Sequence, residues 1–232
     1  MDESRFWQRL WVEEKVHVGK VSKQADQFNS LQEKLVHRLA VIAKHYDISQ
    51  MHFACCQDTD EDRGTVQYLQ DCAKESGLST DFVFIEDIGL AECGSFSDLQ
   101  DNKIQTLFKL YPWEFMQREE FGESIEAAQV NWLEPIWKSI LSNKALMPML
   151  WKLFPNHPNL LPSYFEDELT KATETKLVKK PIFSREGANI SVIEDGKTVL
   201  HADGPYGEEG FIYQAYYPLP QFGNNHTLIG SW

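Results

Sequence analysis

The feature that most constrains this chain is an alternation of helical and strand-like patterns in its first half. Residues 25–46 place Phe28, Leu31, Leu35, Leu39 and Ile42 at helical spacing, which predicts an amphipathic helix. The run "MHFACC" follows as a buried strand, "RGTVQYLQDCAKESG" is a second helix, and "DFVFIED" and "IQTLFKL" are two further strands. This order predicts a small α/β layer with a mostly parallel sheet.

The second half has a different pattern. "YPWEFMQREEFGES" favours a helix, "WLEPIWKSILSNKALMPMLWKLF" is rich in Trp and Leu and is interrupted by Pro135 and Pro148, and a proline-rich loop follows. Asp195-Gly196 between two apolar runs is a strong signal for a two-residue hairpin, and "GFIYQAYYPLP" predicts one more strand. We therefore expect an α/β plus α+β protein with domains at residues 1–128 and 129–232.

The charge is unevenly distributed. The net charge of −13 argues against nucleic acid as a partner, because phosphate binding needs a basic surface. Residues 51–102 carry twelve acidic and two basic side chains, whereas residues 131–200 carry nine basic ones. Two interpretations stay open: an ordinary solvated surface, or an acidic zone for a cationic substrate beside a basic zone for phosphates.

The location of the protein is also constrained by its sequence. No run of 18 apolar residues is present, so we expect no transmembrane helix. The charged start "MDESRFWQRL" lacks the apolar region of a secretory signal. Cys55, Cys56, Cys72 and Cys93 show no Cys-x-x-Cys spacing, which predicts reduced core thiols. We expect a cytoplasmic protein with no membrane or nucleic-acid partner, and the oligomeric state stays open.

The segment "KLVKKPIFSREGANISVIEDGKTVLHA" at residues 176–202 combines strands with basic residues. On a strand, Val178 and Lys180 share one face and Lys179 takes the other. A lysine beside a glycine-containing turn can contact a phosphate, because the turn offers backbone N–H groups and Gly187 permits close approach. The alternative is that these lysines are solvated, and we assign Lys179 to that class.

Four stretches carry a resemblance to a known family. "LFKLYPWEF", "EPIWKSILSNKALMPMLWKLFPNHPNLLP", "KKPIFSREGAN" and "IYQAYYPLP" occur in that order. Together they closely resemble the glutathionylspermidine synthase family of ATP-grasp ligases, particularly its stand-alone bacterial acid–amine ligases. The resemblance extends from about Gln27 to Trp232, and it implies that residues 129–232 form part of an ATP-grasp domain.

The resemblance also implies roles for individual residues. ATP-grasp enzymes hold ATP between two α+β subdomains, and Lys144 in "SNKALMP" and Lys180 before Pro181 look like the two lysines that reach its phosphates. The implied nucleotide contacts are Lys144, Lys180, Ser184, Gly187, Ala188, Asn189, Gln214 and Tyr216. Arg185 is similar to a family arginine that contacts the acid substrate near its reacting carboxylate, which makes it the catalytic candidate.

The implied reaction is ATP-dependent ligation of a carboxylate and an amine. The carboxylate attacks the γ-phosphate of ATP, and an amine then displaces phosphate from the acyl phosphate to give an amide. Lysines and Mg²⁺ stabilise the charge on the transferring group. The expected partners are a glutathione-like or peptide carboxylate and an amine, with a polyamine as one candidate; their identities stay open.

The acidic turn "CQDTDEDRG" follows the first strand, at the end where α/β sheets bind ligands. Glu61 and Asp62 look like the acidic pair in the polyamine site of the family. The alternative is an ordinary helix start, where acidic residues favour the helix dipole. A divalent metal at Asp58, Asp60 and Asp62 is also conceivable, although the turn lacks the pattern of an EF-hand.

The chain also departs from the family. Its Arg-Phe-Asp and Glu-x-Asn-Ala-Asp elements, which supply an arginine and magnesium ligands, do not occur here. We expect a chain truncated at both ends, with unknown magnesium ligands and untested activity. Two rival functions stay open: a non-catalytic interaction module that predicts no MgATP binding, and an ATP-dependent phosphotransferase that predicts no amide product.

Overall fold

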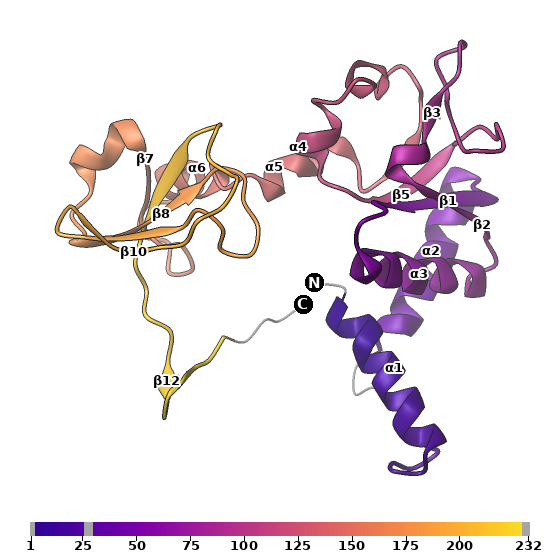
Figure 1. Ribbon diagram of the computed structural model, residues 1–232, viewed down its shortest axis with the longest axis horizontal. Coiled ribbons are helices and arrows are strands. Elements are labelled where there is room, and N and C mark those ends of the chain that lie inside the picture. Colours follow the sequence, from indigo (N-terminus) through magenta and orange to yellow (C-terminus); the bar gives the residue numbers. More distant parts are fainter. Residues whose placement is uncertain (1–2, 26–29, 229–232) are drawn as a thin grey trace. The chain divides into compact units, whose positions relative to one another are not determined.

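The computed structural model describes residues 3–25 and 30–228, and the chain divides into two compact units between Ile136 and Trp137 (Figure 1). We call them the first and the second unit. The division lies after the boundary expected at residue 128. The reason is that β6 (Asn131–Leu133) pairs in parallel with β5 (Thr106–Leu110) and so belongs to the first sheet.

The first unit contains the predicted parallel sheet. Its strands are β1 (Gln50–Cys55), β2 (Ser79–Phe84), β5 and β6, and their order is β2-β1-β5-β6. All neighbouring pairs are parallel, which confirms the α/β prediction. From β1 the chain goes first to β2 on one side and later to β5 on the other. The carboxyl ends of β1 and β5 therefore form the switch point where open α/β sheets bind ligands.

Two helices form the layer over one face of this sheet. They are α2 (Leu31–Tyr46) and α3 (Asp60–Glu75), and α1 (Glu3–His17) lies beside α3 (Figure 1). Phe53 of β1 and Val66 of α3 belong to one buried cluster, against which Leu39 of α2 packs. The predicted apolar stripe of α2 is thus confirmed from Leu31 onward, while Phe28 lies outside the described residues.

The opposite face is covered by short elements. They are η1 (Ile85–Asp87), β3 (Gly89–Leu90), β4 (Phe96–Ser97), α4 (Trp113–Met116) and η2 (Gly122–Ser124). "YPWEFMQREEFGES" was expected to be helical, but only α4 and η2 form. After Met116 the backbone makes short-range turn bonds, such as Arg118 N–H to Phe115 O, in place of a continuing α-helical ladder.

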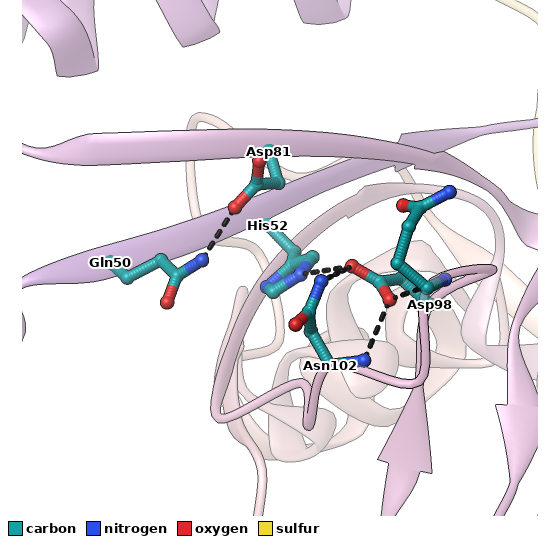
Figure 2. Close-up of polar contacts among 6 residues, drawn as sticks. Gln50, His52, Asp81, Asp98 and Asn102 are labelled. Atoms are coloured by element: carbon teal, nitrogen blue, oxygen red, sulfur yellow. Dashed lines mark hydrogen bonds and ion pairs between the residues drawn. The ribbon is translucent and has the colours of Figure 1, made fainter.

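A buried polar cluster fastens the loop after β4 onto β1 (Figure 2). The Asp98 carboxylate accepts hydrogen bonds from the backbone N–H groups of Gln100 (2.9 Å) and Asn102 (2.8 Å), and its Oδ2 lies 3.4 Å from Nε2 of His52 on β1. Burial acts to raise the pKa of Asp98, but these hydrogen bonds outweigh it and hold that pKa below its ordinary value. These hydrogen bonds between buried polar groups hold the loop after β4 against β1.

The second unit is built on an antiparallel sheet. Its strands are β7 (Ser163–Phe165), β8 (Lys176–Pro181), β9 (Ser191–Glu194), β10 (Lys197–His201) and β11 (Phe211–Ala215), in the order β10-β9-β8-β11-β7. The predicted hairpin is confirmed, because Asp195 and Gly196 connect β9 and β10 with φ of 49° and 75°. The other elements are η3 (Ile136–Lys138), α5 (Ser139–Ser142), α6 (Leu146–Leu153), η4 (Glu166–Lys171), β12 (Gln221–Phe222) and β13 (Asn225–His226).

Two further expectations concern cysteines and membranes. All four thiols are free, but only Cys55 and Cys72 are buried, and Cys93 is exposed between β3 and β4. The prediction of core thiols is therefore wrong for Cys93, because the turn that carries it projects from the apolar layer. Within residues 3–25 and 30–228, no helix combines the length and the apolar character that crossing a membrane requires.

Candidate functional site

Lys180 is held in a defined position on the sheet of the second unit. It lies on β8, opposite Ile212 of β11. Its Nζ donates a hydrogen bond to Oε1 of Gln214 (2.7 Å), and Nε2 of Gln214 donates to Oγ of Ser163 on β7 (3.1 Å). Two of the predicted nucleotide residues, Lys180 on β8 and Gln214 on β11, are thus in direct contact, and Ser163 extends the chain of hydrogen bonds to β7.

The ammonium of Lys180 lies in an environment that disfavours its charge. Burial lowers the pKa of Lys180, and burial is the sole cause of that shift. Its hydrogen-bond acceptor is the neutral amide of Gln214. A partly buried ammonium that faces a neutral acceptor would gain stability from an anion. This property makes Lys180 suited to binding a phosphate.

Lys144 is held against the segment that follows β8. Its backbone N–H donates to Ile182 O (2.9 Å), and its Nζ donates to the carbonyl oxygen (2.8 Å) and the hydroxyl oxygen (2.9 Å) of Ser184. The first predicted lysine therefore contacts the start of the predicted phosphate loop. The second, Lys180, lies on the strand that leads into the same loop.

The loop Ser184–Asn189 is a compact turn. Glu186, Gly187 and Asn189 have φ of 52°, 79° and 55°, which is the left-handed region where successive N–H groups can converge. Ala188 N–H donates to Arg185 O (2.9 Å), and Asn189 Oδ1 accepts from Tyr206 N–H (2.8 Å). The side chain of Arg185 is exposed on this turn.

Further contacts hold the C-terminal end of the loop in place. Asn189 N–H donates to Asp203 O (3.4 Å), and Gly204 lies so close that a Cβ there would be 2.6 Å from Ala188 Cβ. The loop is thus supported by the segment that follows β10. Arg185 on the same loop is exposed, so a ligand can reach it.

Tyr216 lies just beyond β11, on the side of Lys176. Tyr216 N–H donates to Lys176 O (3.1 Å), and Lys176 Nζ lies 4.7 Å from the centroid of the Tyr216 ring. Tyr216 is 41% exposed, so part of the residue is accessible to a ligand. On the opposite face of β8, Lys179 Nζ lies 4.0 Å from the Phe211 ring centroid. Lys179 therefore makes a cation–π contact, where full solvation was expected.

The acidic candidates lie in the first unit. Glu61 and Asp62 are in the first turn of α3, and Thr59 caps that helix by accepting a hydrogen bond from Asp62 N–H (3.2 Å). This is the helix start that favours acidic side chains. It also lies directly after β1, at the carboxyl edge of the parallel sheet. The structure thus fits both the dipole interpretation and the ligand interpretation of the pair.

Other carboxylates gather at the same edge. Burial raises the pKa of the Cys56 thiol, which follows β1, to about 12, and the nearby carboxylate of Glu86 acts in the same direction. Asp58 and Asp62 also contribute. Glu86 itself accepts a hydrogen bond from Gln57 N–H (3.2 Å). The edge is therefore strongly acidic, which suits a ligand with ammonium groups.

Lys109 on β5 is a residue that the sequence prediction missed. It is 5% exposed, its Nζ donates to Tyr111 O (2.7 Å), and the ammonium lies 3.7 Å from the centroid of the Trp113 ring. Burial lowers the pKa of Lys109 to about 8, although Glu134 and Glu114 act to raise it. A lysine inside an apolar strand was the available signal, because lysine is almost never buried without partners.

A model of the glutathionylspermidine synthase preATP-grasp family matches residues 1–232. The chain belongs to the glutathionylspermidine synthase family. A Haemophilus influenzae protein named "Putative acid–amine ligase" is 39% identical over 218 residues, which cover 90% of this chain and 56% of that protein. The bifunctional glutathionylspermidine synthetase/amidase of Escherichia coli is 29% identical over 225 residues, which cover 85% of this chain and 36% of that protein.

Trypanothione synthetase of Crithidia fasciculata is 28% identical over 210 residues, which cover 79% of this chain and 31% of that protein. The chain thus spans little more than half the length of the first of these relatives and about a third of the others. The resemblance that the motifs predicted is confirmed at the level of the family. The mixed α/β fold is confirmed as well, by the parallel sheet of the first unit and the antiparallel sheet of the second.

Proposed function

We propose that the chain takes part in ATP-dependent ligation of a carboxylate and an amine, with the nucleotide bound by the second unit. The observation that carries this proposal is the pair of anchored lysines, one on β8 and one beside the loop that follows it. Membership of the glutathionylspermidine synthase family supports the same reaction class. The identities of the acid and the amine are left open.

The residues of the second unit fit a polyphosphate. Lys144 and Lys180 offer ammonium groups, and the left-handed residues Glu186 and Gly187 would offer backbone N–H donors. Gln214 would orient Lys180, because its amide already holds the ammonium. Ser184 would do the same for Lys144. Tyr216, with its exposed ring beyond β11, would contact the planar base.

Each group has a task in the proposed chemistry. ATP supplies a phosphoryl group that converts the carboxylate into an acyl phosphate, which an amine can attack. The two lysines would stabilise negative charge on the phosphoryl oxygens, the largest requirement of such a transfer. Arg185 would hold the acid substrate, since a guanidinium binds a carboxylate with two parallel hydrogen bonds.

The amine is assigned to the acidic edge of the first unit. Glu61 and Asp62 would bind an ammonium group there, and Asp58 and Glu86 extend the negative surface. For the metal, no three His, Cys, Asp or Glu side chains within residues 3–25 and 30–228 gather into a cluster that could hold an ion. These residues do not fit a protein-held Mg²⁺, and we assign no step to it.

The decisive experiment is calorimetric titration of MgATP into the whole chain, with Lys180→Ala and Lys144→Ala as variants. Loss of either charged contact should weaken binding by about 1–3 kcal/mol, or roughly 5- to 150-fold. The matched control is Lys179→Ala, because Lys179 carries the same charge next to Lys180 but points to the Phe211 face. We expect this control to bind MgATP with wild-type affinity.

Two outcomes would contradict the proposal. An equal loss in Lys179→Ala and Lys180→Ala would mean that net charge, and not a site, determines binding. Absence of MgATP binding by a folded wild-type chain would favour the non-catalytic module. If MgATP binds, a screen of acids and amines for an amide product then separates a ligase from a phosphotransferase.

A further inference from the structure

Three polar side chains form a chain of hydrogen bonds on the β9–β10 hairpin of the second unit. Ser191 at the start of β9 is opposite His201 at the end of β10. Oγ of Ser191 lies 2.8 Å from Nδ1 of His201, and Nε2 of His201 lies 3.0 Å from Oδ1 of Asp203. On its other side Ser191 is opposite Lys179 of β8, next to Lys180. The chain of hydrogen bonds therefore starts beside the strand that carries a proposed phosphate lysine.

The direction of these hydrogen bonds follows from the chemistry of the partners. An ionised carboxylate only accepts hydrogen bonds, so the Nε2 that faces Asp203 carries a proton. In a neutral imidazole the other ring nitrogen is then an acceptor, and the hydroxyl of Ser191 donates to Nδ1. Ser191 thus fixes the tautomer and the orientation of the His201 ring. The ring in turn donates to the carboxylate of Asp203.

Asp203 begins a segment that supports the C-terminal end of the loop Ser184–Asn189. Its carbonyl oxygen accepts a hydrogen bond from Asn189 N–H (3.4 Å), and Oδ1 of Asn189 accepts one from Tyr206 N–H (2.8 Å). Between these two contacts, Gly204 lies so close to the loop that a Cβ there would be 2.6 Å from Oδ1 of Asn189. The segment therefore contacts the end of the loop at three points.

The position of Asp203 depends strongly on its polar contacts. The β9–β10 ladder continues only to Ala202, whose N–H donates to Ile190 O (2.9 Å). The side chain of Asp203 is 100% exposed, whereas that of His201 is 48% exposed. Packing does not restrain a side chain that is fully exposed, so its hydrogen bond to His201 is what limits its freedom. Loss of the imidazole should therefore loosen the residue that holds Asn189.

We propose that His201 is a positioning residue for the phosphate site, which keeps the loop Ser184–Asn189 in the shape that accepts a phosphate group. The proposal rests on the proposed function and deepens it, because it adds to the same site a residue that does not touch the ligand. His201 acts through Asp203, and Asn189 transmits the effect because its N–H and its side-chain oxygen both contact the supporting segment. A loop that is already ordered loses less conformational entropy when it binds.

The test measures amide hydrogen exchange by NMR on the whole chain in the absence of ATP. The reporters are the N–H groups of Asn189 and Tyr206, which join the loop to its support. Ile212 on β11 is 0% exposed, and its N–H serves as an internal control for the sheet. His201→Ala should accelerate exchange at both reporters about threefold, the effect of one modest hydrogen bond, and leave Ile212 unchanged.

Two conservative variants identify the contact that matters. His201→Gln keeps an N–H group near the position of Nε2 and can still donate to Asp203, so both reporters should exchange at the wild-type rate. His201→Asn places its amide near the position of Nδ1, where it reaches Ser191 but not Asp203, and it should behave like His201→Ala. The matched control is Thr198→Ala, because Thr198 is exposed on the same strand. This control should change neither reporter.

Three outcomes would overturn the proposal. Equal acceleration in His201→Gln and His201→Ala would mean that the contact with Asp203 does not hold the loop, and so would wild-type exchange in His201→Asn. Acceleration at Ile212 equal to that at Asn189 would show a general loss of stability and no positioning role. If His201→Ala does not fold, the glutamine and asparagine variants decide.

Calorimetry with MgATP separates this proposal from the proposed function. His201→Ala should bind MgATP about threefold more weakly, and His201→Gln should bind it like the wild type. A wild-type chain that does not bind MgATP but shows the expected exchange pattern would lose the ligase proposal and keep His201 as the residue that orders the loop. A chain that binds MgATP with the same affinity after His201→Ala would keep the proposed function and lose the positioning role.

Discussion

The two units of this chain bury their side chains in different ways. Among the described side chains, both clusters of buried apolar residues lie in the first unit. In the second unit the buried hydrophobic side chains are Val192, Ile212 and Tyr213. Its sheet depends more on polar pairs, such as Tyr213 OH with Glu166 (3.1 Å). The proposed phosphate site therefore lies on the unit with the sparser apolar core, where local adjustment costs less.

The largest expected effect tests this contrast with one substitution made in each unit. Ile104 in the first unit and Ile212 in the second are both 0% exposed. Ile104→Ala should lower the free energy of unfolding by about 4 kcal/mol, because the dense cluster around it cannot close the cavity. Ile212→Ala should lower it by about 2 kcal/mol, since fewer buried neighbours hold its site open. Denaturant unfolding monitored by tryptophan fluorescence measures the free energy of unfolding of both variants. Equal losses would contradict the proposed difference in packing between the two units.

The same contrast explains what the sequence predicts. Helical spacing in the first half predicted α3, and short apolar runs predicted β1, β2 and β5, because burial imposes these patterns. The hairpin after β9 was predicted by two residues that tolerate a left-handed backbone, Asp195 and Gly196. Local patterns were sufficient wherever local geometry determines the element.

The polar contacts within the fold could not be predicted in this way. His52 and Asp98 are 46 residues apart and meet only when the loop after β4 folds onto β1. Lys109 lies inside an apolar strand, which was a signal of burial, but the sequence does not show that it would contact the Trp113 ring and the Tyr111 carbonyl. Lys180 and Gln214 were each expected at the nucleotide only through family resemblance, and their contact with each other, which depends on the register of β8 and β11, was not predicted.

Lys109 gives the next prediction, because it places a charge inside the densely packed unit. Its pKa is lowered to about 8 in the fold from an ordinary value of 10.5. Between these two values the unfolded chain binds more protons than the folded one, so stability rises with pH. The stability of the wild type relative to Lys109→Met should therefore increase by about 3 kcal/mol from pH 8 to pH 10.5.

Denaturant unfolding of both proteins at several pH values gives this difference. Groups with raised pKa, such as Cys55 and Tyr213, oppose the trend in each protein separately and cancel between them. A difference that stays flat over this interval would mean that Lys109 remains fully charged in the fold. The first unit would then hold a buried cation without the expected penalty, and the contrast with the partly exposed Lys180 would weaken.

The smallest expected effect concerns the backbone of the two units. Gly187 in the loop Ser184–Asn189 and Gly94 in the turn after β3 both have φ of 79°, and a Cβ at either position would meet nothing within 4 Å. Substitution by alanine should therefore lower the free energy of unfolding by about 1 kcal/mol at either position, because both backbones are left-handed. Only Gly187→Ala should also lower the affinity for MgATP, by about fivefold, because its turn is the one that would bind phosphate. Calorimetry on both variants checks this, and equal affinities would show that the loop backbone does not contact the nucleotide, which would leave binding to the two lysines.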